Sequence, residues 1–250
     1  MNHETVLRAN QKFYDIVAAD YRRKESYAYS KKIIKDVTEI LFFCASSAPS
    51  NQSFLDFGCG SGFLSEIIFK HQIFQNAVGI DISSEQVKLF NEKFKSNNYK
   101  AIVSDIVDTG FESNSFDVAG CYSVLHHIYD YKTAVTEITR VLKPGGIFYC
   151  DFEPNRKFQR LMSIPIKIRR KFIDKPPEGL DDLENIAEYH NNFEPGIDKD
   201  HFAIWLSQNY EILKIGPRFP KLFSTLILKV FFHFNWSFSP CFYIIARKKM

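Results

Sequence analysis

The chain has 250 residues, a formal net charge of +3 and 45% hydrophobic residues. This length and apolar content suit one α/β domain with insertions. The small net charge disfavours a nucleic-acid-binding protein, so we expect no DNA partner. The five cysteines contain no C-x-x-C pair and no zinc-ligand spacing, which predicts reduced, packed thiols and no metal site. The N-terminus carries no apolar signal segment, which predicts a cytoplasmic protein.

Two helical segments are expected before the first strand. Residues 14–21 have helical spacing, and Tyr14 and Tyr21 either line the mouth of a pocket or pack on the sheet. Residues 26–44 carry apolar side chains at helical spacing, as in a core helix. A turn rich in Ser, Pro and Asn at 46–53 ends this part. Residues 1–50 are therefore expected to form an N-terminal helical cap.

A buried strand ending in a glycine-rich turn is expected at residues 55–62, which read LDFGCGSG. Gly58, Gly60 and Gly62 let the backbone bend sharply and approach a ligand closely. The helix expected from Phe63 directs its first amides at whatever lies over the turn. The spacing differs from the dinucleotide fingerprint G-x-G-x-x-G. A tight structural turn is the alternative interpretation.

Further strands are expected at residues 76–82 and 100–105, which end in Asp81 and Asp105. An acid at the end of the second strand is well placed to accept hydrogen bonds from both ribose hydroxyls. The alternative for Asp81 is an N-cap of the next helix, and the alternative for Asp105 is an ordinary strand end.

The fourth strand is expected at residues 116–123 and runs into Leu125-His126-His127. A helix end, a turn and a fifth strand are expected over residues 140–148, where proline and paired glycines stop the helix. The sixth and seventh strands are placed at residues 210–216 and 241–248.

These elements together resemble class I S-adenosylmethionine (SAM)-dependent methyltransferases. The resemblance rests on Asp56 two places before Gly58, on the acids at 81 and 105, and on the LHH and LKPGG patterns. It is strong over residues 50–155, and it is closest to the small-molecule branch that includes quinone-biosynthesis methyltransferases.

The resemblance implies an α/β, Rossmann-like fold with a seven-stranded, mostly parallel sheet, helices on both faces and an antiparallel last strand. It implies a single methyltransferase domain over residues 1–250, with a SAM-binding core at 51–155. A lid or substrate insertion is expected at 156–208, before the sixth strand. The C-terminal strands at 209–250 are expected to contain an apolar insertion.

SAM is the implied cofactor, and the resemblance implies contacts from the glycine turn and from the ends of the second, third and fourth strands. Asp105 then accepts from the exocyclic amine of adenine, and the helix carrying Tyr14 and Tyr21 folds across the cofactor. The implied cofactor-binding residues are Asp56, Phe57, Gly58, Cys59, Gly60, Gly62, Asp81, Ile82, Asp105, Ile106 and Cys121.

The methyl group of a sulfonium is already activated, so the protein mainly orients donor and acceptor and excludes water. A hydroxyl acceptor needs a base, for which His126 and His127 are the candidates. We prefer His126, because it follows the strand more closely and is expected nearer the crevice. The alternative is that both histidines pack beneath the site. His190 lies in an H-x-N-x-F stretch that resembles a substrate contact of some relatives, or it lies in a surface loop.

The resulting hypothesis is O- or C-methylation of a small, lipophilic or aromatic metabolite. The tetrapeptide N/D-P-P-Y/F, typical of enzymes that methylate amino groups of bases, does not follow the fourth strand. One alternative is methylation of RNA or protein, weakly supported by the basic cluster at 169–171. Another is a SAM-binding regulatory subunit without turnover.

An apolar stretch at residues 221–236 is interrupted only by Lys221, Lys229 and His233. It is too short and too charged to span a bilayer. It lies on a membrane surface, covers a lipophilic pocket or forms a core helix. The sequence indicates no obligate protein partner.

Overall fold

A seven-stranded sheet is the centre of the computed structural model, with strand order β3-β2-β1-β4-β5-β7-β6. The structure describes residues 2–21, 26–95, 98–162, 180–187, 196–219 and 239–250. The strands are β1 (Ser53–Phe57), β2 (Asn76–Asp81), β3 (Tyr99–Val103), β4 (Phe116–Tyr122), β5 (Leu142–Pro154), β6 (Tyr210–Arg218) and β7 (Cys241–Lys248). Strands β1 to β5 pair in parallel, whereas β7 runs antiparallel to both β5 and β6. The predicted Rossmann-like sheet with an antiparallel last strand is confirmed.

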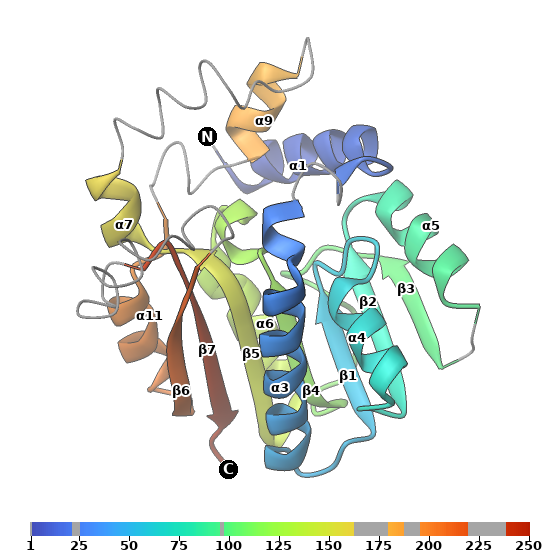
Figure 1. Cartoon of the computed structure of the whole chain (residues 1–250), viewed down its shortest axis with the longest axis vertical. Helices are drawn as coiled ribbons and strands as arrows, with labels where there is room; N and C mark the ends of the chain where they lie inside the picture. The colour runs from blue at the N-terminus through green and yellow to red at the C-terminus, as the bar shows by residue number, and fades with distance from the viewer. Residues whose placement is uncertain (1, 22–25, 96–97, 163–179, 188–195, 220–238) are drawn as a thin grey trace.

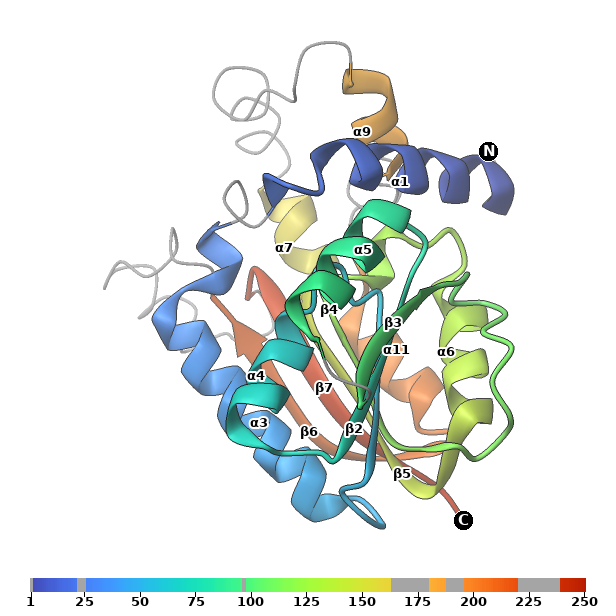
Figure 2. The same ribbon diagram turned by 90° about the vertical axis from the view of Figure 1, so that its right-hand side faces the viewer.

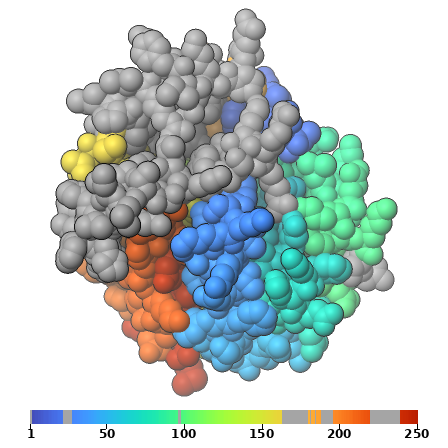
Figure 3. Space-filling model, in the orientation of Figure 1, coloured from blue at the N-terminus to red at the C-terminus, as the bar shows by residue number. Residues whose placement is uncertain are grey.

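Helices cover both faces of the sheet (Figures 1 and 2). On one face lie α3 (Lys31–Ser47), α4 (Phe63–His71) and α5 (Ser84–Lys93), and on the other lie α6 (Tyr131–Val141) and α11 (Lys199–Leu206). Near the carboxyl ends of the parallel strands lie α1 (His3–Val17), α7 (Arg156–Leu161) and α9 (Asp181–Ala187). The short 3-10 turns are η1 (Ser26–Tyr29) and η2 (Leu125–His127). Figure 3 shows the outer surface of α3 between β6 and α4.

The core follows directly from the sequence pattern. All seven residues of β4 are buried, as expected for a strand covered on both faces. Helix α6 buries Ala134, Val135, Ile138 and Val141, which recur on one face of the helix. The central strands are therefore packed between two helical layers. Because β1 to β4 pair in parallel, their carboxyl ends lie along the same edge of the sheet.

The N-terminal helices differ in extent from the prediction. Helix α1 begins at His3, where Asn2 accepts a hydrogen bond from the Thr5 amide, and it ends at Val17. The segment predicted as one helix over 26–44 is divided into η1 and α3, because Ser30 caps α3 and its hydroxyl accepts from the Ile33 amide. The additional N-terminal turns of α1 bring His3 and Asn10 to the cavity described below.

The region expected to form a lid contains two helices with different environments. Helix α11 packs on the sheet through Phe202 and Leu206, which belong to the buried core. Helix α9 instead packs on α1, where Ala187 joins Phe13 and Val17 in a small apolar cluster. The lid interpretation thus does not suit α11, whereas α9 covers the same edge of the sheet as α1.

Several sequence-based predictions lie outside the described residues: the basic cluster at 169–171, His190 and the apolar stretch at 221–236. Among the described helices, none combines the length and the hydropathy needed to cross a bilayer. All five cysteines are buried, and none is in a disulfide, which agrees with the expectation of packed thiols.

Candidate functional site

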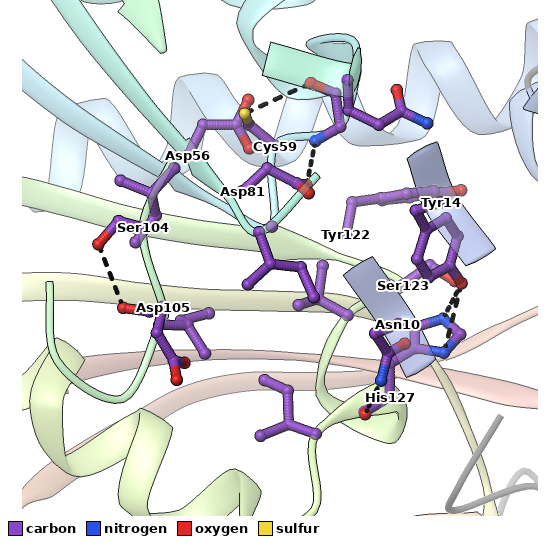
Figure 4. Close-up of a pocket in the computed structure, with 18 of the residues that line it drawn as sticks. Asn10, Tyr14, Asp56, Cys59, Asp81, Ser104, Asp105, Tyr122, Ser123 and His127 are labelled. Atoms are coloured by element: carbon purple, nitrogen blue, oxygen red, sulfur yellow. Dashed lines mark hydrogen bonds between the residues drawn. The ribbon is translucent and has the colours of Figure 1, made fainter. Parts of the chain in front are cut away.

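A cavity of about 130 Å³ lies at the carboxyl ends of β1 to β4, beneath α1 (Figure 4). Most of the residues predicted for the site line it. They are Tyr14, Tyr21, Asp56, Gly58, Cys59, Gly60, Asp81, Ile82, Asp105, Ile106 and His127. The strand order brings residues that are far apart in the sequence to one place, as expected for an open α/β sheet.

Of the predicted residues that the structure describes, four do not line the cavity. Phe57 and Cys121 are fully buried within the sheet, and Gly62 starts helix α4 and donates its amide to the Cys59 carbonyl at 2.8 Å. The His126 side chain is buried and hydrogen-bonded behind the cavity. These residues adjoin residues that line the cavity and do not line it themselves.

The glycine turn needs glycine for reasons of space and of backbone conformation. At Gly58, φ is +64°, and a Cβ there would come within 2.5 Å of Val124 Cγ1. At Gly62, φ is +86°, and a Cβ would meet Phe94 at 2.6 Å. The turn therefore presents bare backbone to the cavity.

Asp81 braces this turn in addition to lining the cavity. Its Oδ2 accepts from the Gly60 amide at 2.8 Å, and its Oδ1 accepts from the Ser83 amide at 2.9 Å. Burial raises the pKa of Asp81, and the two backbone donors oppose that rise. The N-cap of α5 is Ser83 and not Asp81, so the N-cap interpretation of Asp81 is wrong. Asp81 instead accepts from the amide of the cap residue and lines the cavity.

Asp56 is satisfied mainly by the protein. The carboxylate is 2% exposed, and its Oδ2 accepts from the Ser65 hydroxyl at 2.6 Å and from the Ser65 amide at 3.1 Å. Asp56 therefore ties β1 to the first turn of α4, which holds the glycine turn in place.

Helix α1 is fastened across the cavity by polar contacts at both ends. His3 Nε2 lies 3.0 Å from Asp105 Oδ2, at the carboxylate expected to bind adenine. Asp15 accepts from the Ser83 hydroxyl at 2.7 Å and from the Glu85 amide at 3.2 Å, and so it caps α5. A ligand that donates a hydrogen bond to Asp105 Oδ2 would compete with His3.

The loop after β4 is held by a fully buried carboxylate. Glu153 on β5 accepts from three consecutive amides, those of Val124, Leu125 and His126, and also from His126 Nδ1 at 2.8 Å. Burial alone would raise the pKa of Glu153, but His126 and these amides hold it below its ordinary value. The preference for His126 rests on its expected position nearer the crevice. In the structure its ring is buried, is hydrogen-bonded to Glu153 and is not among the residues that line the cavity.

His127 is the histidine that lines the cavity. Its Nδ1 lies 3.1 Å from the Ala187 carbonyl oxygen on α9, and its Nε2 lies 3.0 Å from the Tyr14 hydroxyl on α1. Because a carbonyl only accepts, Nδ1 carries the proton and Nε2 keeps a lone pair. Tyr14 lies beside this acceptor nitrogen, with its ring edge-on to the imidazole (Figure 4).

Two residues that the sequence did not single out carry unpaired acceptor atoms at the cavity. Asn10 on α1 and Gln86 on α5 are 4% and 2% exposed, and both line the cavity. The amide oxygen of each has no hydrogen-bond partner. Buried polar atoms are nearly always paired, so such atoms indicate a site for a hydrogen-bond donor.

The cavity suits a cofactor such as SAM, which carries a sulfonium and an ammonium. Asp56, Asp81 and Asp105 line it, whereas neither lysine nor arginine occurs among its described lining residues. Aromatic rings line the rest, in two groups, with Tyr14 and Tyr21 in one and Tyr29, Phe63 and Tyr122 in the other.

One group of described residues has metal-ligand types, namely Cys121, Cys150 and Glu153, with ligand atoms within 4.8 Å of one another. Burial raises the pKa of Cys121 to about 11 and raises that of Cys150 well above its ordinary value. Both thiols pack in the buried core, and Glu153 already accepts four hydrogen bonds. The chemistry of this group favours packing over metal binding.

Comparison with known proteins identifies a matching family model and similar enzymes. Residues 55–150 match a family model described as a methyltransferase domain. Demethylmenaquinone methyltransferase of Staphylococcus aureus is 30% identical over 154 residues, which cover 60% of each chain. The O-methyltransferase rstn1 of Aspergillus nomiae is 35% identical over 105 residues, which cover 40% of this chain and 46% of that protein. The chain thus spans less than two thirds of the length of these relatives.

The fold also matches that of solved structures. The methyltransferase solved in complex with the Trm112 activator of Haloferax volcanii has a TM-score of 0.64 and 14% identity, over 96% of this chain and 98% of that one. At this identity the match concerns the fold alone.

Proposed function

Because the chain belongs to the class I SAM-dependent methyltransferases, we propose that it methylates a hydroxyl oxygen of a small, uncharged, lipophilic or aromatic molecule. The alternative within this proposal is transfer of the methyl group to a carbon atom of the same kind of molecule. The single observation that carries the proposal is the lining of the cavity, which combines three carboxylates, an acceptor imidazole and aromatic rings.

The charge of the cavity supports an uncharged acceptor. Its described lining includes aspartates but neither lysine nor arginine, so a phosphate or carboxylate on the acceptor would add a second anionic group beside the carboxylate of the cofactor and would meet no cationic side chain. The aromatic rings provide apolar walls for a planar or lipophilic group. The same reasoning weighs against RNA, whose binding relies on cationic side chains.

The cofactor site follows from the residues that the cavity assembles. In this proposal Asp81 accepts from ribose hydroxyls and Asp105 accepts from the adenine amine. The bare backbone of Gly58 and Gly60, which also line the cavity, supports close approach of the cofactor. When bound, SAM supplies an activated methyl group. Every other requirement of the reaction falls on the protein.

His127 is the proposed base. With its Nδ1 proton directed at the Ala187 carbonyl, His127 presents the Nε2 lone pair on the side of the Tyr14 hydroxyl, and this lone pair takes the proton of an acceptor hydroxyl as the new O–CH₃ bond forms. The resulting imidazolium keeps the same Nδ1 bond and returns its proton to water. Tyr14 occupies the position next to Nε2, so the acceptor hydroxyl either displaces the Tyr14 hydroxyl or passes its proton through it.

Calorimetric titration with SAM, followed by an assay of methyl transfer from radiolabelled SAM, tests the proposal. We expect SAM binding, and we expect transfer to neutral phenols or lipophilic alcohols in preference to matched carboxylic acids and to RNA. Labelling of RNA or protein instead would replace the proposal with the macromolecular alternative. SAM binding without transfer to any acceptor class would favour a regulatory subunit.

A further inference from the structure

We propose that Asn10 binds the ammonium group of the cofactor through its amide oxygen. This inference rests on the proposed function, since it concerns the same cavity. Asn10 lies in the middle of α1, is 4% exposed and lines the cavity. Its Oδ1 atom is one of two buried side-chain oxygens and nitrogens in the described structure without a hydrogen-bond partner.

The orientation of the Asn10 amide is fixed by its surroundings. Nδ2 donates to the Val6 carbonyl at 2.9 Å, one turn back along α1, and to the His127 carbonyl at 2.9 Å. Both N–H groups are therefore used on carbonyl oxygens (Figure 4 shows the bond to His127). Exchanging the amide oxygen and nitrogen would set an oxygen against two oxygens, so Oδ1 is the atom that has no hydrogen-bond partner.

The place of Asn10 along the sheet edge identifies the part of the cofactor that it meets. The strand order is β3-β2-β1-β4, and Asp105 follows β3 while Asp81 ends β2. If adenine binds at Asp105 and ribose at Asp81, the amino-acid part of the cofactor would extend over β1 towards the loop after β4. Asn10 is hydrogen-bonded to that loop at His127.

The chemistry of this part of the cofactor leaves one group for an acceptor oxygen. The carboxylate and the sulfur centre have no hydrogen to donate, whereas the ammonium has three. An amide oxygen held in a buried position is therefore matched to the ammonium. The absence of lysine and arginine among the described lining residues is consistent with a cationic ligand group here.

Calorimetry with S-adenosylhomocysteine and its deamino analogue, which lacks only the amino group, tests the inference. Wild-type protein should bind the deamino analogue about ten- to a hundredfold more weakly. Asn10→Leu should bind S-adenosylhomocysteine more weakly by a similar factor, and it should no longer distinguish the two ligands. Asn91→Leu is the matched control, because the Asn91 amide is satisfied by both backbone groups of Ala101. It should keep the wild-type ratio.

The outcomes separate the two proposals. Failure of the wild-type protein to bind S-adenosylhomocysteine would overturn the proposed function. Equal affinity of wild-type protein for the two ligands would overturn the role of Asn10, whether or not the leucine variant folds. An Asn10→Leu or Asn10→Ala variant that weakens both ligands equally would show that Asn10 only anchors α1.

Discussion

Replacing Glu153 with glutamine should destabilise the protein by about 3–5 kcal/mol. The Glu153 carboxylate is fully buried and accepts four hydrogen bonds of 2.8 to 3.1 Å from the loop after β4. A glutamine offers one oxygen and places an NH₂ group where the second oxygen was. The His126 amide then loses its acceptor, and the His126 ring must either change tautomer or lose its acceptor as well, at about 1–3 kcal/mol for each lost bond.

Equilibrium unfolding in urea at neutral pH, followed by circular dichroism, measures this loss directly. Glu112→Gln is the matched control, because the same chemical change is made at an exposed position. It should change the free energy of unfolding by less than about 0.5 kcal/mol. A loss below about 1 kcal/mol in Glu153→Gln would refute the idea that this carboxylate holds the loop.

The same variant has a predicted pH signature. The pKa of Glu153 is below its ordinary value of 4.5 in the folded protein, so the unfolded chain binds more protons in that range. The stability that Glu153 contributes is therefore complete above the unfolded pKa and is lost as the pH falls through the lower, folded pKa. The difference in unfolding free energy between wild type and Glu153→Gln should shrink on acidification below about pH 4.5. A difference that stays constant would contradict this assignment.

Three further predictions concern the cavity. Asp81→Ala should weaken SAM binding by about 1–3 kcal/mol in calorimetry, because the variant loses both the bonds to ribose and the hydrogen bond from the Gly60 amide. An unchanged affinity would show that Asp81 does not bind the cofactor. His127→Gln should lower kcat for an identified hydroxyl acceptor about 10²- to 10⁴-fold while SAM affinity stays within about twofold, whereas an undiminished kcat would eliminate His127 as the base. His3→Ala should raise SAM affinity by about fivefold at most, because a partly exposed pair that competes at Asp105 is worth little, and a weaker affinity would show that His3 assists binding.

The sequence was sufficient to predict the sheet and the cofactor turn, because both depend on local patterns. Strand periodicity marks β1, β2 and β4, and the three glycines are needed for a turn whose geometry is set within a few residues. The contacts of α1 were not accessible in this way. His3 meets Asp105 across 102 residues, and Asn10 meets His127 across 117 residues. Such pairs depend on how the helix is docked rather than on any motif.

The choice between two adjacent histidines shows the same limit on a smaller scale. Along a short 3-10 turn, neighbouring side chains point in different directions, and a shift of one residue exchanges the buried ring for the cavity-lining one. Glu153 determines which of the two rings is buried, because it binds His126. It lies 27 residues further along the chain. No pattern within the LHH stretch contains this information.

The buried polar residues of this protein form two groups: those whose hydrogen bonds are made within the protein, and those with an unpaired atom. Asp56 and Glu153 have the types expected of catalytic or binding groups, but serine and backbone donors occupy them, so they hold the glycine turn and the loop after β4. The amide oxygens of Asn10 and Gln86 have no such partner, although both are at the cavity wall. Leaving a buried acceptor unpaired costs about 1–3 kcal/mol, and a ligand that donates a hydrogen bond recovers this cost on binding. The residues that recognise the cofactor are therefore to be sought among the unpaired acceptors of the cavity as well as among its carboxylates.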